Sequence, residues 1–421
     1  MKAVVVERNA HRFAAARVAS AVGGSASALR LGPLRLLDTE PPRLPGIDWH
    51  RVRPLLAGIC GSDLSTVDGK SSRYFESIVS FPFVLGHEIV GEVLDGPHAG
   101  RRVVVEPVLG CEARGIEPRC PACARGHKGA CERIAYGELR PGLQTGFCAD
   151  TGGGWSEELV CHESQLHAVP DSLSDEAAVM VEPTACGIHA ALAGRVSSTD
   201  RVVVLGAGTL GLTTLAALHA YSPPAHLVAV AKHTLQRDLA RALGADEVVK
   251  PEEVTRAVRR VTASLALTRD DGALRRLAGG AEVVFDCVGT STSLTTCLDI
   301  VRPGGRVVLV GMPATLHVDL AALWQREIAL VGAYAYGTEE RPDGPYATFE
   351  LALELVERAC LGRLVGAHYP LERYEEAIRH AASAGRRGAI KVVFDLRADE
   401  SNWRQRGARA AARSTSEKES T

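Results

Sequence analysis

The stretch RVVVLGAGTLGLTTLAALHA, residues 201–220, decides the fold of this chain. It reads as a buried strand, then a glycine turn with the spacing G-x-G-x-x-G, then an apolar helix. In such a turn the first glycine permits the sharp bend, the second lets a pyrophosphate approach the backbone, and the third lets helix and strand pack closely. The helix N-terminus then offers free N–H groups to the phosphates; the alternative is a tight turn that binds nothing. The residues expected at the coenzyme are Gly206, Gly208, Thr209, Leu210 and Gly211.

Strand-like and helical stretches alternate downstream of this turn. Strands are expected at 227–231, 282–286 and 306–311, with a helix at 236–243. This alternation predicts an α/β fold with a parallel, doubly wound sheet. Two further helices are expected at 347–358 and 374–384, and a last strand at 390–396.

The first 180 residues have a different texture. They are rich in glycine, proline and turns, with short apolar runs such as 103–105 and 159–161. This pattern predicts an irregular, mostly β domain with long loops. The Ala-rich segment 11–27 fits a helix or a loop equally well.

The strand after the glycine turn bears on the choice of coenzyme. In NAD-binding units this strand ends in Asp or Glu, which binds the ribose hydroxyls. Here it ends in Ala231, Lys232 and His233, and Arg237 follows one helical turn later. Cations in place of the acid suit a 2′-phosphate, so the sequence favours NADP over NAD. Alternatively, Lys232 and His233 are ordinary solvated loop residues.

Length and composition limit the classes of function. A chain of 421 residues exceeds one ordinary domain and suggests two. A hydrophobic content of 46% and a formal charge of −2 predict a globular, cytoplasmic protein with no general affinity for nucleic acid or membranes. The chain has no apolar run of about 18 residues, and its charged opening MKAVVVERNA is not typical of a signal peptide. The basic run 404–413 has no apolar periodicity and predicts a solvated tail.

Four of the eleven cysteines are clustered in one loop. Cys120 and Cys123 are separated by two residues, Cys131 follows after seven more, and Cys111 precedes Cys120 by eight. Four thiolates at such spacings fit a closed, tetrahedral zinc site that holds together a loop with little core of its own. The rival is a redox C-x-x-C pair, which prefers a βαβ setting that this Pro-, Gly- and Arg-rich loop lacks.

Two further stretches contain candidate metal ligands. GICGSDL (58–64) places Cys60 in a turn beside Ser62 and Asp63, and GHEIVGEV (86–93) places His87 and Glu88 ahead of a strand. Taken singly, Cys60 is more often a buried thiol and His87 a packed histidine. Their joint occurrence with the cysteine cluster and the glycine turn makes ligation the better interpretation.

The order of these motifs carries a family resemblance. The order is GICGSDL, GHEIVGEV, the cysteine cluster, VVVLGAGTLG (202–211), FDCVG (285–289) and RPGGRVVLVGMP (302–313). Over residues 1–396 the chain resembles the zinc-dependent medium-chain dehydrogenases of the alcohol dehydrogenase superfamily, and within them the sorbitol and threonine dehydrogenases. That branch has a glutamate rather than a cysteine near the third ligand position, where VEPTACGIHA (181–190) supplies Glu182.

The resemblance implies a catalytic zinc ion in addition to the structural one. Cys60 and His87 match fixed zinc ligands, Glu88 matches a direct or exchangeable ligand, and Glu182 matches the other carboxylate. The zinc would act as a Lewis acid that lowers the pKa of an alcohol, so that hydride can pass to the nicotinamide. Ser62 matches the hydroxyl that begins a proton relay. Two further matches are Asp63, which would orient the site, and Lys391, which would reach the coenzyme pyrophosphate.

The chain departs from the family pattern at two places. Relatives have two residues rather than eight between the first two lobe cysteines, so whether Cys111 completes the structural site depends on the path of the longer loop. Many relatives pass the proton to solvent through a histidine five residues after the zinc cysteine, where this chain has Ser65. The relay then runs through a hydroxyl and water, or the reaction favours carbonyl reduction.

The resemblance also implies domains, a reaction and an assembly. A GroES-like catalytic domain with the zinc lobe would span 1–185, a Rossmann coenzyme domain 186–333, a return to the catalytic domain 334–396, and a disordered tail 397–421. The implied reaction is hydride transfer between NAD(P) and a small alcohol, polyol or carbonyl. The alternatives are a zinc-free enone or quinone reductase and a non-catalytic coenzyme-binding relative. A homodimer or homotetramer is expected, because relatives associate through the strand at 306–311 and the segment after it.

Overall fold

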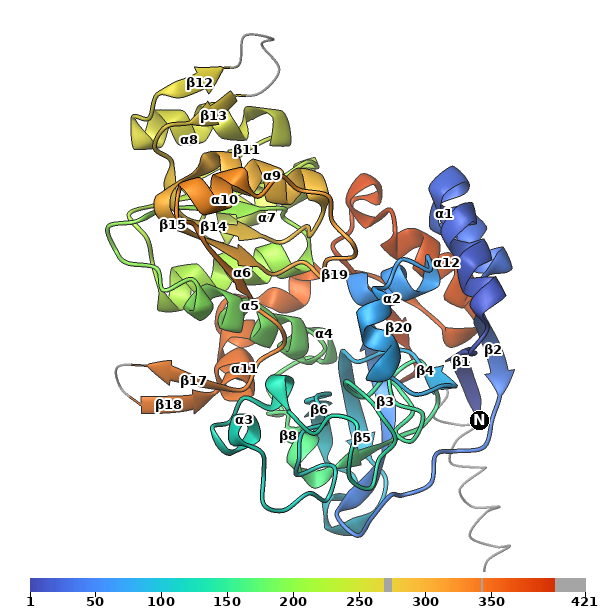
Figure 1. Ribbon diagram of the computed structural model, residues 1–421. Helices are drawn as coiled ribbons and strands as arrows, with labels where there is room; N and C mark the ends of the chain where they lie inside the picture. The colour runs from blue at the N-terminus through green and yellow to red at the C-terminus, as the bar shows by residue number, and fades with distance from the viewer. Residues whose placement is uncertain (269–274, 342–343, 398–421) are drawn as a thin grey trace, which may run out of the picture.

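A six-stranded parallel sheet is built around the strand that precedes the glycine turn (Figure 1). The structure is a computed structural model that describes residues 1–268, 275–341 and 344–397. Every neighbouring pair in this sheet is parallel, which confirms the predicted doubly wound fold. The strand order is β11 (Glu247–Val249), β10 (His226–Val230), β9 (Arg201–Leu205), β14 (Ala281–Asp286), β15 (Val301–Leu309) and β16 (Ala329–Gly332).

Alternate residues of β9 are buried on opposite faces of the parallel sheet. Val202 and Val204 belong to one core, with residues of α5 (Val181–Ala193) and α6 (Thr209–Tyr221). Val203 and Leu205 belong to another, with residues of α8 (Val254–Thr262) and α9 (Ser291–Ile300). Because helices cover both faces, the strand is apolar throughout rather than alternating. The shorter helices α7 (Thr234–Ala242) and α10 (Ala321–Gln325) pack against β10 and against α9.

A second, seven-stranded sheet contains the motifs from the first half of the chain and ends with a strand from its far end. Its pairs are antiparallel except for β19 with β20. Figure 1 shows β20, in red, among the blue and teal elements, where it pairs with β3. The strands run in the order β19 (Val365–Tyr369), β20 (Lys391–Asp395), β3 (Trp49–Gly58), β5 (Ile89–Val93), β6 (Arg102–Val105) and β8 (Leu166–Ala168), with β7 (Leu159–His162) paired to β3.

The N-terminal segment forms a three-stranded sheet with a long helix inserted in it. Strands β1 (Lys2–Val6) and β2 (Leu34–Asp38) pair antiparallel, and β4 (Phe83–Val84) lies on the other side of β1. The connection between β1 and β2 is α1 (Ala10–Leu31), which resolves the open prediction for 11–27 in favour of a helix with a kink at Gly24. In Figure 1 α1 lies beside α2 (Gly61–Val67) and α12 (Tyr374–Ala381), and both contacts are close.

Small elements complete the described part of the chain. These are α3 (Pro121–Ala124), α4 (Asp175–Ala178), α11 (Thr348–Arg358) and the hairpins β12 (Ala266–Thr268) with β13 (Arg275–Leu277) and β17 (Thr338–Arg341) with β18 (Gly344–Ala347). No helix of the described residues is long and apolar enough to cross a membrane.

Most predicted strands and helices lie within two residues of the observed bounds, and two differ by more. Strand β15 starts five residues earlier than predicted, because Val301 already pairs with β14 before a bulge shifts the register to Arg306. Helix α12 ends at Ala381 rather than 384, where a 3-10 turn takes over. Of the predicted tail, 398–421 lies outside the described residues, whereas Arg397 is held by ion pairs with Asp175, Glu176 and Asp395.

Candidate functional site

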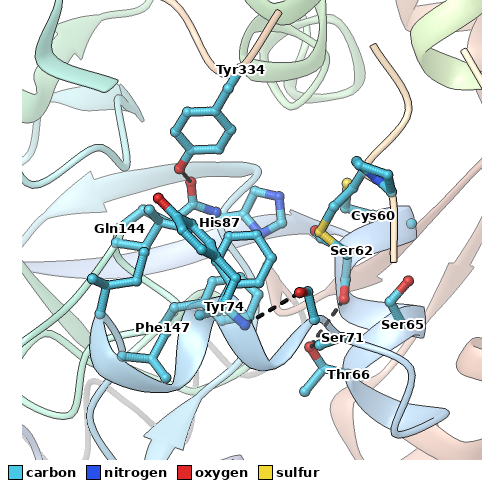
Figure 2. Close-up of a pocket in the computed structure, with 18 of the residues that line it drawn as sticks. Cys60, Ser62, Ser65, Thr66, Ser71, Tyr74, His87, Gln144, Phe147 and Tyr334 are labelled. Atoms are coloured by element: carbon cyan, nitrogen blue, oxygen red, sulfur yellow. Dashed lines mark hydrogen bonds between the residues drawn. The ribbon is translucent and has the colours of Figure 1, made fainter. Parts of the chain in front are cut away.

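A cavity of about 1710 Å³ is lined by residues that come from both large sheets. One side is formed by the turns that follow β9, β14 and β15, including Thr209, Val288 and Gly311. The other side contains Cys60 and His87 (Figure 2). The volume exceeds the roughly 300–1,000 Å³ of a typical small-molecule site, so it can hold the end of a coenzyme together with a substrate.

Three of the predicted metal ligands meet on this cavity. The pairing of β3 with β5 sets Gly58 opposite Glu88, with a 2.8 Å backbone hydrogen bond, and so brings the ends of both motifs together. Ligand atoms of Cys60, His87 and Glu88 all lie within 4.8 Å of one another. A thiol, an imidazole and a carboxylate at this separation form the donor set that zinc prefers.

Asp63 orients two of these groups from a fully buried position. Its Oδ2 accepts a 2.8 Å hydrogen bond from the backbone N–H of Cys60, and its Oδ1 lies 3.5 Å from Nδ1 of His87. Burial alone would lower the pKa of His87, but Asp63 outweighs burial and holds that pKa well above its usual value. Because Nδ1 faces Asp63, the other ring nitrogen, Nε2, is left to bind a metal.

The four clustered cysteines also come together. The sulfurs of Cys111, Cys120, Cys123 and Cys131 lie within 4.8 Å of one another and are buried. The Sγ atoms of Cys111 and Cys131 are 3.7 Å apart, which matches the edge of about 3.8 Å expected for a sulfur tetrahedron with Zn–S bonds of about 2.3 Å. The eight-residue interval thus loops out without removing Cys111 from the group.

Backbone N–H groups favour the thiolate form of these cysteines. Each of the four sulfurs accepts one N–H, donated by Cys111, Cys120, Cys123 or Arg133 at 3.4–3.5 Å. Burial opposes ionisation of Cys120, yet the N–H groups of Cys123 and Glu132 and the neighbouring thiols bring its pKa down to about 6. Burial raises the pKa of Cys123 and raises that of Cys131 to about 11, so these thiols need a bound cation to ionise.

The glycine turn has the geometry that a pyrophosphate needs. Gly206 has φ +99°, which disfavours any other residue. A Cβ on Gly211 would lie 1.8 Å from the carbonyl oxygen of Gly206, so the helix could not approach the strand with a side chain there. Gly208, by contrast, faces open space, and α6 begins at Thr209, one residue later. Backbone N–H groups therefore face an unobstructed approach, as the sequence predicts.

Comparisons with known proteins agree with this geometry. The family model for the alcohol dehydrogenase GroES-like domain matches residues 46–171, and that for the zinc-binding dehydrogenase matches 209–358. An L-idonate 5-dehydrogenase from Vitis vinifera is 29% identical over 376 residues, and a sorbitol dehydrogenase from Arabidopsis thaliana is 29% identical over 374. Each alignment covers 86% of this chain and 93% of the relative. The fold also matches an Escherichia coli CFT073 alcohol dehydrogenase complexed with NADH, with a TM-score of 0.67, 19% identity, and 94% and 99% of the two chains covered.

The chain belongs to the zinc-dependent medium-chain dehydrogenases. Within them it falls in the sorbitol dehydrogenase-like branch, and it is an oxidoreductase of alcohols or their carbonyls. Zinc and a nicotinamide dinucleotide are the cofactors of this class of enzyme, and both donor sets described above fit zinc. The predicted fold class and family are thereby confirmed.

Glu182 lies outside the 4.8 Å group, although it lines the same cavity of the dehydrogenase. It projects from the first turn of α5, and its Oε1 accepts a 3.2 Å hydrogen bond from the hydroxyl of Tyr336. Burial raises the pKa of Glu182 to about 7; His87 lowers that pKa and Glu88 raises it. Because burial penalises an unneutralised carboxylate here, a cation in the cavity would favour the ionised form.

Lys391 has a different position from the one the resemblance implies. Its Nζ is buried and donates to both carboxylate oxygens of Glu88 at 2.6 Å, and to the carbonyl oxygen of Ile59 at 3.3 Å. Burial would lower the pKa of Lys391, but Glu88 outweighs burial and raises it. Lys391 thus neutralises Glu88 instead of extending toward a pyrophosphate, while the ligand atom of Glu88 still lies within 4.8 Å of those of Cys60 and His87.

Ser62 presents a free hydroxyl to the cavity. Its Oγ is buried and has no hydrogen-bond partner among the described residues. In Figure 2 it lies beside Cys60, while Ser65 and Thr66 lie further along α2. A buried hydroxyl without a partner costs free energy unless a ligand supplies one, so Ser62 is placed to bind a reacting oxygen.

Several residues of the site carry no signal in the sequence. Tyr334 and the partly buried Phe147 reach the cavity from loops with no motif, and only the fold brings them there. At the coenzyme side, Arg237 donates to the carbonyl oxygen of Lys232 at 3.1 Å, which places its guanidinium over the end of β10. The 3-10 turn Ala384–Arg387 packs against His233, so two exposed arginines of that turn lie near the same end.

Proposed function

We propose that this dehydrogenase transfers hydride between NADP and the carbinol carbon of an alcohol, at a zinc ion held by Cys60, His87 and Glu88, with Glu182 as the other carboxylate of the cavity. The observation that carries the proposal is the convergence of Cys60 and His87, oriented by Asp63, beside the unpartnered hydroxyl of Ser62. Three protein ligands leave one position open for a substrate oxygen. The oxidation converts alcohol and NADP⁺ into carbonyl, NADPH and a proton.

Each residue has a defined task in this scheme. A bound zinc ion supplies Lewis acidity that lowers the pKa of the substrate hydroxyl. Ser62 accepts the hydroxyl proton through Oγ and passes it along the polar side of α2, where Ser65 takes the place of a histidine. Asp63 keeps His87 in the tautomer that binds metal through Nε2. Lys391 balances the charge of Glu88, and Glu182 is the second carboxylate that lines the cavity.

The coenzyme turn is proposed to bind the pyrophosphate, with cations at the end of β10 for the 2′-phosphate. The candidate cations are Lys232, His233 and Arg237, which follow buried Ala231 directly or by one helical turn. Among these residues no carboxylate stands where an NAD ribose would need one. The cysteine lobe is proposed to hold a second zinc ion with a structural role.

Assembly and domain limits are also proposals. Strand β16 is the edge of the parallel sheet, and Leu330 on it and Trp324 before it are exposed. An exposed apolar edge strand suits pairing with a second copy of the chain, as a homodimer or within a homotetramer. The parallel sheet lies within the proposed coenzyme domain, 186–333, and the seven-stranded sheet within 1–185 and 334–396.

The test combines metal content with turnover. The purified enzyme should contain about two zinc ions per chain and should reduce NADP faster than NAD with the same alcohol, followed by nicotinamide absorbance. Cys60→Ser should lose one zinc ion and all turnover while still binding NADPH. Retained turnover in that variant would refute the zinc mechanism, and a strong preference for NAD would refute the coenzyme assignment.

A further inference from the structure

Helix α1 forms part of the substrate cavity of this chain. Strands β1 and β2 are antiparallel neighbours that a short turn could join, yet 22 helical residues connect them. Residues along α1, among them Phe13 and Val18, line the cavity. The insertion therefore adds a wall to the site rather than a remote surface feature.

Close packing fixes α1 against the helix that carries Ser62. At Gly69, just after α2, φ is +62° and a Cβ would lie 2.4 Å from the carbonyl oxygen of Phe13. At Gly32, just after α1, a Cβ would lie 3.5 Å from the carbonyl oxygen of Val67. Gly69 thus allows the end of α2 to approach the backbone of α1 closely, and Gly32 meets α2 at ordinary van der Waals distance, which holds the wall in place.

A continuous row of aromatic rings leads from α1 to the metal site. Phe13 contacts Phe81 edge-on with centroids 6.1 Å apart, and Phe81 contacts Phe83 at 5.0 Å. Phe83 contacts Phe147 at 5.4 Å, and Phe147 lies 5.9 Å from the imidazole of His87. All four phenylalanines line the cavity. Figure 2 shows Phe147 and Tyr74 beside His87.

Several hydroxyls on this wall are already engaged within the protein. The hydroxyls of Thr66 and Ser71 are hydrogen-bonded to each other at 3.2 Å, and the Oγ of Ser72 accepts from the N–H of Tyr74. The Oγ of Ser80 accepts from a backbone N–H at 3.0 Å. The hydroxyl of Ser62, at the metal, is the exception among these.

This distribution decides between two classes of alcohol. A polyol carries a hydroxyl on each carbon, and each one buried without a partner costs roughly 1–3 kcal/mol. A ring-bearing apolar alcohol has one hydroxyl for Ser62 and the metal, and its skeleton gains by contact with the aromatic row. The cavity of about 1710 Å³ also has space for such a skeleton beside the nicotinamide end of a coenzyme.

We propose that the substrate is a secondary alcohol, or its ketone, on a bulky apolar, ring-bearing skeleton that packs on Phe13, Phe81, Phe83 and Phe147. This inference rests on the proposed function and specifies its substrate class. The step is the oxidation already given: the alcohol loses its proton and a hydride, NADP⁺ gains the hydride, and a ketone leaves. Small polyols are then poor substrates, although relatives of the chain carry the names of polyol dehydrogenases.

Steady-state kinetics of the zinc-loaded enzyme with NADP would test this, with 1-phenylethanol and sorbitol as the probes. The kcat/KM for 1-phenylethanol should exceed that for sorbitol by about a hundredfold or more. Tyr74→Ala removes an exposed ring at the cavity and cannot unfold the core, so it should raise KM for 1-phenylethanol by about tenfold with little change in kcat. Phe13→Ala should do the same, whereas Val22→Ala, on the exposed side of α1 and outside the cavity, should leave both constants unchanged.

The outcomes separate the two proposals. Efficient turnover of sorbitol with none of 1-phenylethanol would overturn the substrate class while supporting hydride transfer. If neither alcohol is oxidised, calorimetric titration of 1-phenylethanol into the enzyme with zinc and NADPH bound decides the inference. If 1-phenylethanol binds and Tyr74→Ala weakens that binding, the result supports the apolar site and counts against the proposed chemistry. If 1-phenylethanol does not bind, the inference is overturned.

Discussion

Lys391 and Glu88 form an ion pair in the interior of the protein, with Nζ 2.6 Å from each carboxylate oxygen. The pair joins β20, from the end of the chain, to the metal motif before β5. Removing one partner leaves the other charged in a place where water cannot reach it. Since the ligand atom of Glu88 lies within 4.8 Å of those of Cys60 and His87, the pair also governs how much negative charge a metal ion experiences.

We predict that Lys391→Met destabilises the zinc-loaded enzyme by about 3 kcal/mol, because Glu88 is left buried and unpaired. The midpoint of urea unfolding measures the change. The double variant Glu88→Gln with Lys391→Met should recover at least half of the loss, since neither charge then remains. Equal instability of the single and double variants would show that Lys391 acts through packing alone.

The sequence predicts the local features of this site better than the contacts between distant segments that complete it. The glycine turn and the strand around 201–205 are predictable because Gly206 requires a positive φ and Gly211 packs against Gly206, only five residues away. Cys60 and His87 are found through motifs in which ligand and orienting residue are close in the chain. The Lys391–Glu88 pair spans 303 residues, and no local pattern distinguishes a pyrophosphate ligand from a buried counter-ion.

The role of α1 could not be predicted for the same reason. An Ala-rich segment with two adjacent glycines is ambiguous between helix and loop, and its contact with α2 depends on Gly69, far along the chain. The aromatic row combines residues from three separate segments. Such a row becomes visible only after the strands have paired.

The unusual interval in the cysteine lobe allows a specific prediction. Cys111→Ser should lose one zinc ion per chain and lower Tm, because the sulfur tetrahedron loses the member that lies 3.7 Å from Cys131. Metal analysis and a thermal scan measure both effects. Cys360→Ser is the matched control, since Cys360 is exposed and outside both metal groups, and it should change neither. A full zinc content in Cys111→Ser would assign the fourth ligand to another residue.

The coenzyme preference can be reversed at the end of β10. Lys232→Asp places a carboxylate where an NAD ribose would bind and removes a cation from the proposed 2′-phosphate site. We predict that kcat/KM for NADP falls by about tenfold or more and that the value for NAD rises. Arg241→Asp is an exposed change on α7, the helix that follows Lys232. It should leave the ratio of the kcat/KM values for NADP and NAD unchanged. If Lys232→Asp also leaves it unchanged, Lys232 is a solvated loop residue.

Glu106 connects the cysteine lobe to the seven-stranded sheet and should make stability depend on pH. Its Oε2 lies 2.9 Å from Nε2 of His167 on β8 and 3.3 Å from Nζ of Lys128 in the lobe. Burial would raise the pKa of Glu106, but His167 and Lys128 outweigh burial and lower it. A carboxyl whose pKa is lower in the folded state stabilises the fold above its unfolded pKa of about 4.3, and this contribution is lost as the pH falls through the folded value.

The variant Glu106→Gln tests this linkage because it keeps the shape and removes the charge. At pH 6 it should lower the stability of the zinc-loaded enzyme by about 2 kcal/mol, seen as a fall of a few degrees in Tm. The difference from the unmodified enzyme should shrink as the pH is lowered below about 4, where Glu106 becomes neutral in both states. Glu112→Gln is the control within the same lobe, because Glu112 pairs with Arg119 near the surface and should contribute little at any pH. If Glu106→Gln is less stable than the unmodified enzyme by the same amount from pH 6 to below about pH 4, the side chain acts through its hydrogen bonds and not through its charge.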